Sequence, residues 1–206
     1  YEKFIVIAKE ELDDRFFLQT PETDSGYYYG HLKIRKNGTT CIRRSEWVHK
    51  MPFHQGVFVD VFPLDAVPDR EFARKMHRFL VMTASSIARS APYDLSVGDI
   101  KEKNKKRFRK YRRILRFIKP IHFSRFRDWV VQRYNTRQTK EIGQLGNAYK
   151  FYPQFAWERH WFDETTEVSF ENLMISVPTE FDKILTRLYG DWKTPRQTGN
   201  YHGDIF

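Results

Sequence analysis

Residues 57–62, with the sequence Val-Phe-Val-Asp-Val-Phe, are an apolar run that contains a single carboxylate, Asp60. In an extended strand side chains alternate between two faces, so the three valines would line one face and Asp60 would lie between two phenylalanines on the other. The run begins after Gly56 and ends at Pro63, and this pattern predicts a central strand that is buried on both sides. A buried carboxylate is costly unless it is protonated, paired or bound to a metal, so we expect Asp60 to have a partner.

The length and composition are those of one globular domain. The chain has 206 residues, of which 40% are apolar and 17% aromatic, which is enough to bury a sizeable core. Cys41 is the only cysteine, which excludes an internal disulfide and a cysteine-rich zinc site and fits a reducing compartment. No apolar run approaches the roughly 20 residues of a membrane span, and no signal-peptide pattern is present. We therefore expect a cytoplasmic protein that does not cross a membrane.

Positive charge is concentrated in residues 101–140. This segment contains 16 Lys and Arg residues but only two acidic residues, Glu102 and Asp128, so its net charge is +14, whereas the net charge of the whole chain is +10. Such a segment is typical of contact with an anionic partner, which could be membrane lipid, a cell-envelope polymer or nucleic acid. The alternative is a solvated helix surface that only aids solubility.

The Asn37-Gly38 pair lies between two alternating runs and predicts a type I′ β-hairpin. That register places Lys33, Arg35 and Thr40 on one face of the hairpin. Two cations and a hydroxyl on one face could hold a phosphate, Arg with its bidentate fork and Lys as a point charge. Exposed hairpins commonly carry the same residue types, so this pattern alone does not establish a site.

The rest of the chain predicts helices and a second hairpin. Apolar residues recur at helical spacing over 69–90, and again in two stretches of residues 101–140 that Pro120 separates. A short hairpin that turns at 171–172 and a helix over 180–189 follow. We therefore predict an α+β fold in three parts. These are a sheet-containing part at 1–65, a basic helical region at 66–145, and a C-terminal hairpin, helix and tail at 146–206 that complete the core.

Several kinds of site are excluded because their motifs do not occur. The sequence has no Gly-x-Ser-x-Gly elbow, no metal-type histidine spacing, no Gly-rich phosphate loop and no ribonucleoprotein-type aromatic motif. What remains is Asp60, flanked by His54 and Asp65, next to the basic hairpin. This combination suggests a phosphoryl transferase in which Mg²⁺ neutralises both Asp60 and the substrate phosphates. One carboxylate cannot build such a site, so we expect at least one further acidic ligand.

Five segments carry a resemblance to a known family. They are Tyr1-Glu2-Lys3-Phe4 through Phe17-Leu18-Gln19-Thr20, Tyr27-x-Tyr29, Lys33-Ile34-Arg35 with the Asn37-Gly38-Thr39-Thr40 turn, His54 through Asp65, and Leu188-Tyr189-Gly190-Asp191-Trp192-x-x-Pro195 followed by His202. Together they resemble the LicD family of phosphorylcholine-type transferases, which is also similar to fukutin and fukutin-related protein. The resemblance covers nearly the whole chain. Its motif at 54–65 is specific, whereas the basic helical region matches in character only.

The resemblance implies a nucleotidyltransferase-like fold, in which a small mixed sheet is flanked by helices and binds a divalent cation, Mg²⁺ or Mn²⁺. The implied reaction moves phosphocholine or a polyol phosphate from a CDP-activated donor to a cell-surface glycan precursor, such as that of lipopolysaccharide or teichoic acid. Asp60 matches a catalytic, metal-binding carboxylate of the family. The positions that match its donor-binding side are Lys33, Arg35, Thr40, His54, Asp65 and His202.

Members of the family carry a Gly-rich segment and an acidic Asp-Asp-x-Asp motif before the residue that matches Tyr1. The resemblance therefore implies that the main metal ligands precede Tyr1 and that residues 1–206 alone are inactive. We further expect the basic segment 101–140 to contact an anionic membrane peripherally, at its inner face. Two alternatives stay open, a nucleotidyltransferase that acts on another substrate and a basic nucleic-acid-binding protein without enzymatic activity; a nucleic-acid partner is the less favoured expectation.

Overall fold

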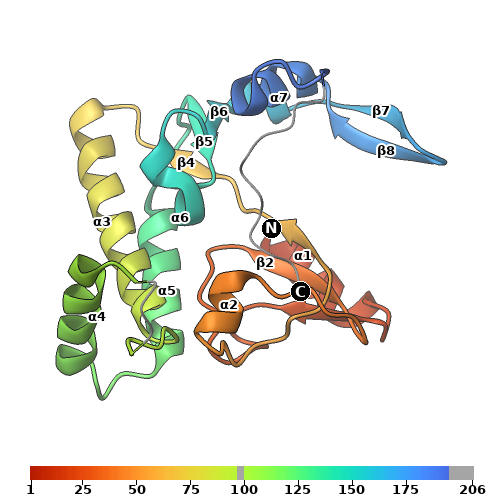
Figure 1. Ribbon diagram of the computed structural model, residues 1–206. Helices are drawn as coiled ribbons and strands as arrows, with labels where there is room; N and C mark the ends of the chain where they lie inside the picture. The colour runs from red at the N-terminus through yellow and green to blue at the C-terminus, as the bar shows by residue number, and fades with distance from the viewer. Residues whose placement is uncertain (97–99, 195–206) are drawn as a thin grey trace.

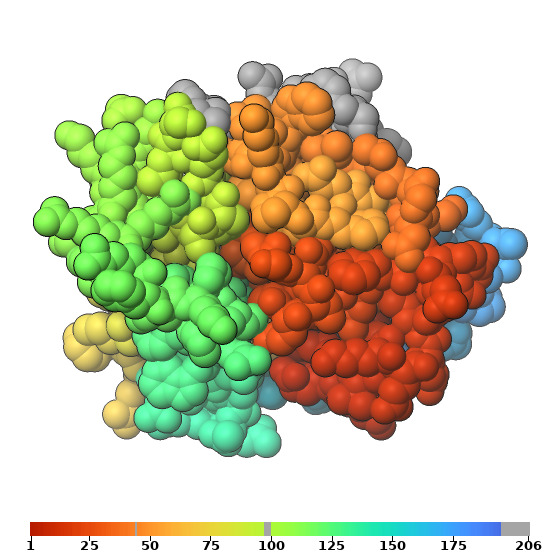
Figure 2. All heavy atoms as spheres, turned by 90° about the horizontal axis from the view of Figure 1, so that it is seen from below, coloured from red at the N-terminus to blue at the C-terminus, as the bar shows by residue number. Residues whose placement is uncertain are grey.

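The structure of the protein is a computed structural model that describes residues 1–96 and 100–194. It contains two small antiparallel sheets, a separate β-hairpin and helices, so the predicted α+β class is confirmed. The N-terminal part, red to orange in Figure 2, lies side by side with the helical part, which is yellow-green to teal. His202, one of the predicted site residues, lies outside the described residues.

The first sheet is antiparallel and has the strand order β1-β2-β3 (Figure 1). Its strands are β1 (Phe16–Gln19), β2 (Leu32–Lys36) and β3 (Phe58–Val61). Helix α1 (Glu2–Glu11) covers one face, where its Ala8 packs against Leu32 of β2. Because side chains alternate along a strand, Lys33 and Arg35 of β2 point to the opposite face.

The central strand of this sheet is β2, so the prediction that residues 57–62 form a central strand buried on both sides is wrong. Strand β3 lies at the edge of the sheet, and Val57 and Val59 are 50% and 67% exposed. In β2, by contrast, both Lys33 and Arg35 are fully buried. Charged residues are usually at the surface, so the charged side chains of β2 make its sequence typical of an exposed strand although the strand is buried.

The hairpin predicted around residues 37–38 does not form. The residues after this turn leave the sheet, and β3 takes the place beside β2. The Thr39 side chain accounts for the change, because its hydroxyl donates to Lys36 O at 2.7 Å and accepts from Val57 N at 3.0 Å. Thr40 is exposed as a result, and it does not share a face with the two cations of β2.

The helices of the basic region confirm the predictions for 69–90 and 101–140. They are α3 (Glu71–Ser90), α4 (Glu102–Ile114) and α5 (Pro120–Val131). Pro120 occupies the first turn of α5, where its fixed φ suits a helix and its missing N–H costs nothing. Helices α3 and α5 pack together, and His77 of α3 donates from Nε2 to Val130 O of α5 at 2.8 Å.

A second antiparallel sheet packs on these helices. Its strands, in spatial order, are β4 (Asp65–Val67), β5 (Glu141–Gly143) and β6 (Ala156–Glu158), and the short helices nearby are η1 (Gln132–Tyr134), α6 (Leu145–Ala148), η2 (Tyr149–Phe151) and η3 (Arg159–Phe162). The core between sheet and helices consists of Val67, Val81, Val130, Val131, Leu145, Tyr149 and Ala156. Asp65 begins β4, so Asp60 and Asp65 belong to different sheets.

The C-terminal elements also match their predictions. They are the antiparallel strands β7 (Thr165–Phe170) and β8 (Leu173–Pro178), followed by α7 (Phe181–Tyr189). The hairpin turns at Glu171, which has a positive φ of 52°, and it projects away from the rest of the protein in Figure 1. Gly190 ends α7 with a φ of 72°. Within the described ranges, no helix is long and apolar enough to span a membrane.

Candidate functional site

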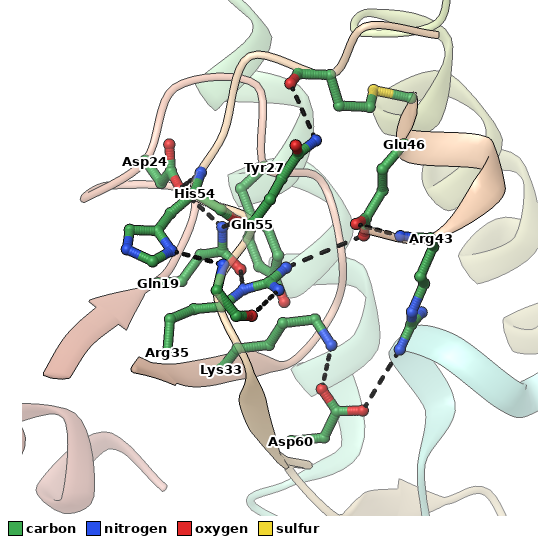
Figure 3. A network of polar contacts seen from close by, with 12 residues as sticks. Gln19, Asp24, Tyr27, Lys33, Arg35, Arg43, Glu46, His54, Gln55 and Asp60 are labelled. Carbon is green, nitrogen blue, oxygen red and sulfur yellow. Dashed lines mark hydrogen bonds and ion pairs between the residues drawn. The ribbon is translucent and has the colours of Figure 1, made fainter. Parts of the chain in front are cut away.

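Asp60 of β3 lies opposite Lys33 of β2 and is the centre of a charged cluster (Figure 3). Lys33 Nζ donates to Asp60 Oδ1, and His31 Nε2 lies 3.2 Å from the same oxygen. The other carboxylate oxygen faces Arg43 Nη2 at 3.9 Å. The side chains of Lys33 and His31 are buried, whereas those of Asp60 and Arg43 are 24% and 25% exposed. Solvent therefore reaches this cluster, the Asp60 cluster, through Asp60 and Arg43.

The neighbours of Asp60 keep it ionised. Burial would raise the pKa of Asp60, but its contacts with His31 and Lys33 outweigh burial and hold that pKa well below the usual value. Burial lowers the pKa of Lys33 to about 8, although the carboxylate opposes this shift. Burial also lowers the pKa of His31, so its ring is neutral at pH 7. At neutral pH the cluster therefore combines a carboxylate, a neutral imidazole and two cations.

The cations of the chain itself balance the charge of Asp60, so burial of this carboxylate does not require a metal ion. The argument from burial therefore does not call for Mg²⁺ at Asp60, and the expectation of Mg²⁺ or Mn²⁺ there depends on the family resemblance. Among residues 1–96 and 100–194, no group of three His, Cys, Asp or Glu is arranged to hold a metal ion. Asp60 supplies a single carboxylate, and Lys33 already occupies one of its oxygens. The residues that the structure describes do not by themselves fit a complete metal site.

Phe58 organises the cations of the site. The centroid of its ring lies 3.5 Å from Lys33 Nζ, 4.6 Å from Arg35 Cζ and 5.0 Å from Arg43 Cζ. The negative face of an aromatic ring attracts cations, and the attraction strengthens when water is excluded. Phe58 therefore helps to hold three like charges close together, next to Asp60.

Arg35 is enclosed by the protein and joins its strands. Arg35 Nε donates to Gln19 Oε1 of β1 at 2.8 Å, and Nη1 donates to Gly56 O, just before β3, at 2.7 Å. Glu46 of α2 (Arg44–Val48) lies 4.0 Å from Arg35 Nη2. These contacts hold β1, β3 and α2 around the central strand. Donor binding by Arg35 stays a prediction, and this geometry does not favour it.

Asp65 lies in a different environment from Asp60. Its Oδ1 accepts from Asn135 Nδ2 at 2.8 Å, while Oδ2 has no hydrogen-bond partner among the described residues. Burial raises the pKa of Asp65 to about 6. Asp65 lines a cavity of about 400 Å³, the strand-side cavity, whose wall also includes Tyr29, His31 and Arg127. His31, which contacts Asp60, thus lines the same cavity as Asp65.

Two further predicted residues lie away from the Asp60 cluster. The ring of His54 stacks on Phe17, with 5.2 Å between the ring centroids, and its Nε2 lies 3.0 Å from Asn37 Oδ1. These contacts fix the turn after β2. Thr40 is exposed beyond that turn. Of the predicted site residues, the structure brings together Lys33 and Asp60, with Arg35 behind them.

His31 and Arg43 are members of the cluster that sequence reasoning did not select. His31 precedes Lys33 by two residues, so the alternation that placed Lys33 and Arg35 on one face also includes His31. Arg43 had no such local signal. It reaches Asp60 only because the segment after the turn leaves the sheet instead of pairing with β2.

A second cavity, of about 550 Å³, lies between α3, α4 and the segment around α6, and we call it the helix-side cavity. His31 lines both cavities. The cavities meet where Gly30 lies against Gly146, and a Cβ atom on Gly30 would be only 3.0 Å from the Gly146 backbone. Gly30 N donates to Asn147 Oδ1 at 3.1 Å, which fixes this contact.

No protein-family model, curated protein or solved structure matches this chain. Membership of the LicD family therefore stays a prediction from the sequence motifs. The residues and their geometry are the basis for the function proposed here.

Proposed function

We propose that the protein is a LicD-type transferase that moves phosphocholine or a polyol phosphate from a CDP-activated donor to a hydroxyl of a cell-surface glycan precursor. The observation that carries the proposal is the convergence of three family-like motifs on Asp60. Lys33 Nζ, which pairs with Asp60, lies 5.8 Å from the ring centroid of Tyr29 and 3.5 Å from that of Phe58. Residues from three of the family-like motifs thus surround one ion pair, and this supports the proposal.

In the proposed reaction, the hydroxyl oxygen of the acceptor attacks the phosphorus atom that carries the alcohol. The bond between this phosphorus and the bridging oxygen breaks, and CMP leaves with the electron pair. Arg43, which is partly exposed beside Asp60, would bind phosphate oxygens of the donor. His31 is neutral and 3.2 Å from Asp60, and both of its ring nitrogens are buried. It would accept the hydroxyl proton once the bound acceptor displaces the groups that cover the ring, while the carboxylate stabilises the imidazolium.

The resemblance also assigns a divalent cation to Asp60, and such an ion would neutralise the diphosphate of the donor. The described residues contribute one carboxylate to it, so binding of Mg²⁺ or Mn²⁺ stays part of the proposal. For this binding, Lys33 would have to share or release the oxygen that it holds. The steps assigned to Arg43, His31 and Asp60 do not depend on the ion.

Donor screening with the full-length protein tests the proposal. CDP-choline, CDP-ribitol and the four ribonucleoside triphosphates are each incubated with an envelope glycan acceptor, and the released CMP or pyrophosphate is measured. We expect CMP from one of the two CDP-linked donors, in amounts that depend on the acceptor. Release of pyrophosphate from a triphosphate would instead favour a nucleotidyltransferase. No turnover, together with steeply salt-dependent binding of RNA, would favour the nucleic-acid-binding alternative.

We propose in addition that the turn between α4 and α5 docks on an anionic membrane. Ile114 and Phe117 at this turn are 64% and 85% exposed. Exposed cations, Arg113, Arg116 and Lys119, surround them. Apolar side chains can enter the lipid interface while neighbouring cations bind anionic headgroups, so this surface suits peripheral contact with a membrane.

Charge reversal on α4 and its turn is expected to weaken vesicle binding. The variant replaces Arg109, Lys110, Arg113 and Arg116 with Glu. Since each basic residue near an anionic surface contributes about 1 kcal/mol, the affinity for vesicles with phosphatidylserine should fall by more than about tenfold, most clearly at low salt. A matched control reverses the exposed residues Lys3, Lys36, Lys50 and Arg70. Equal losses in both variants, or no loss in the first, would contradict the assignment.

A further inference from the structure

The β7–β8 hairpin is amphipathic, because alternate side chains of a strand point to opposite faces. The strand pairing puts one threonine and five apolar side chains on the same face: Thr166, Val168, Phe170, Leu173, Ile175 and Val177. The opposite face is mainly polar and consists of Thr165, Glu167, Ser169, Met174, Ser176 and Pro178. The hairpin therefore has one apolar face, of the kind that normally packs against another element.

This apolar face is open to solvent. Phe170 and Leu173 are 59% and 58% exposed, and no residue of the two strands is buried. A two-stranded hairpin is at best marginally stable alone and needs further strands or a helix packed against it. In Figure 1 the hairpin projects away from the rest of the protein. The described part of the chain therefore leaves the apolar face available to a partner.

The hairpin is also acidic, although the chain as a whole has a net charge of +10. Residues 161–182 contain six acidic residues and no Lys, Arg or His. Two of them, at the start of α7, pair with lysines of the same chain. The other four are exposed in or beside the hairpin and make no ion pair with a described residue: Asp163, Glu164, Glu167 and Glu171. An anionic membrane or nucleic acid would be repelled here, so we expect a partner that carries cations.

Helix α3 presents an exposed apolar stripe of the opposite charge. Phe72, Met76, Phe79 and Leu80 recur at intervals of three and four residues, which places them on one side of the helix. Phe72 and Phe79 are 78% and 65% exposed. The helix contains four Lys and Arg residues and one acidic residue, and the neighbouring α4 contains eight and one. We call this surface the α3 stripe.

The α3 stripe and the apolar face of the hairpin agree in size. The stripe is about 12 Å long, at about 1.5 Å per helical residue. The apolar face from Thr166 to Phe170 is about 14 Å long, at about 3.4 Å per strand residue. In Figure 1 α3 and the hairpin lie at opposite sides of the protein, so the two surfaces of one chain do not meet. Two copies of the chain can bring them together.

We propose that the protein associates with itself head to tail, and that the apolar face of the β7–β8 hairpin in one copy packs on the α3 stripe of the next. The cations of α3 and α4 attract the acidic side chains of the hairpin. A contact between different surfaces of two copies is heterologous and can continue from copy to copy. This association goes beyond the proposed transfer reaction and does not depend on it.

Sedimentation velocity of the full-length protein at increasing concentration tests the proposal. We expect the mean mass to rise between micromolar and millimolar concentrations, since a contact between one hairpin and one helix is small. Leu173→Thr should weaken the association by at least about tenfold, because it removes an apolar side chain from the centre of the contact. Threonine suits a strand, and Leu173 is exposed, so the hairpin should persist.

Met174→Thr is the matched control. Met174 is the next residue of β8, is 63% exposed and lies on the opposite face of the hairpin. Its replacement should leave the association unchanged. Equal losses in Leu173→Thr and Met174→Thr would overturn the proposal, because packing through the apolar face alone cannot produce them.

A mixing experiment identifies the two surfaces. Phe72→Ala should weaken the association as Leu173→Thr does, although the two residues lie in different parts of the chain. Each variant keeps the surface that the other has lost, so an equimolar mixture should again form pairs that neither variant forms alone. If hairpins packed on each other instead, Phe72→Ala would associate like the wild type, and the proposal would be wrong.

Charge reversal tests the electrostatic part of the contact. Glu164→Lys/Glu171→Lys should weaken the association several-fold at low salt and less at high salt, because salt screens exposed charges. A wild type that stays monomeric at every concentration overturns the proposal. If that monomer binds phosphatidylserine vesicles and Leu173→Thr abolishes the binding, lipid covers the hairpin instead of a second copy.

Discussion

Replacement of Asp60 by Asn is expected to abolish transfer from a CDP-linked donor in the full-length protein while the fold is retained. The amide keeps the shape of the carboxylate but removes the charge that keeps the Asp60 cluster together, so His31 and Arg43 lose their common partner. Lys33 is fully buried and would also lose its counter-charge. We expect the free energy of unfolding to fall by roughly 2–3 kcal/mol, less than for a fully buried pair because Asp60 is partly exposed.

The double variant Lys33→Met/Asp60→Asn is the matched control for this result. It removes both members of the ion pair, so most of the lost stability should return, because no charge is left buried and unpaired. Transfer should not return, since His31 still lacks the carboxylate. Turnover that is unchanged in Asp60→Asn, or restored in the double variant, would mean that Asp60 serves only to neutralise Lys33. The measurements are CMP release and denaturant unfolding.

Gly56→Ala is expected to destabilise the protein more than Asp60→Asn does. A Cβ atom at this position would lie 2.3 Å from the carbonyl oxygen of Lys36 and 2.8 Å from the ring of His54. The first contact is with backbone that pairs β2 with β3, because Lys36 N donates to Val57 O at 2.8 Å. Backbone cannot move aside as a side chain can, so we expect a loss of about 3 kcal/mol or more.

The same substitution should also reduce transfer, because displacement of β3 moves Asp60 away from Lys33. Val57→Ala at the neighbouring position is the control. Val57 is 50% exposed, and its truncation should cost less than about 1 kcal/mol. Urea unfolding measures the loss of stability in each of the two variants, provided that the m-value does not change. Equal midpoints for the two variants would show that the β2–β3 pairing tolerates a side chain at residue 56.

The elements that could be predicted from the sequence are those with local signals. The helices in 69–90 and 101–140 repeat apolar residues within a few turns, and Pro120 divides the latter segment where α5 begins. The hairpin at Glu171 and helix α7 follow from equally local patterns. The central strand could not be identified in this way. Its burial depends on two contacts with distant residues. Asp60 neutralises Lys33, and the carbonyl oxygen of Gly56 accepts a hydrogen bond from Arg35. Each contact joins residues that are more than 20 positions apart in the sequence.

The candidate site was predictable in part for the same reason. Asp60 was conspicuous because it interrupts an apolar run, and Lys33 because it alternates with Arg35 along one strand. Thr40 was misplaced because the turn motif at 37–38 favours a hairpin, whereas the Thr39 hydroxyl bridges to β3. Arg43 could not be foreseen, since its approach to Asp60 depends on where the chain runs after leaving the sheet.

The contact of Gly30 with Gly146 brings two main chains together at a point that belongs to the walls of both cavities, and a side chain at residue 30 would force them apart. His31 follows Gly30 directly and is part of the wall on both sides. A molecule admitted to either cavity therefore changes the surroundings of the same imidazole.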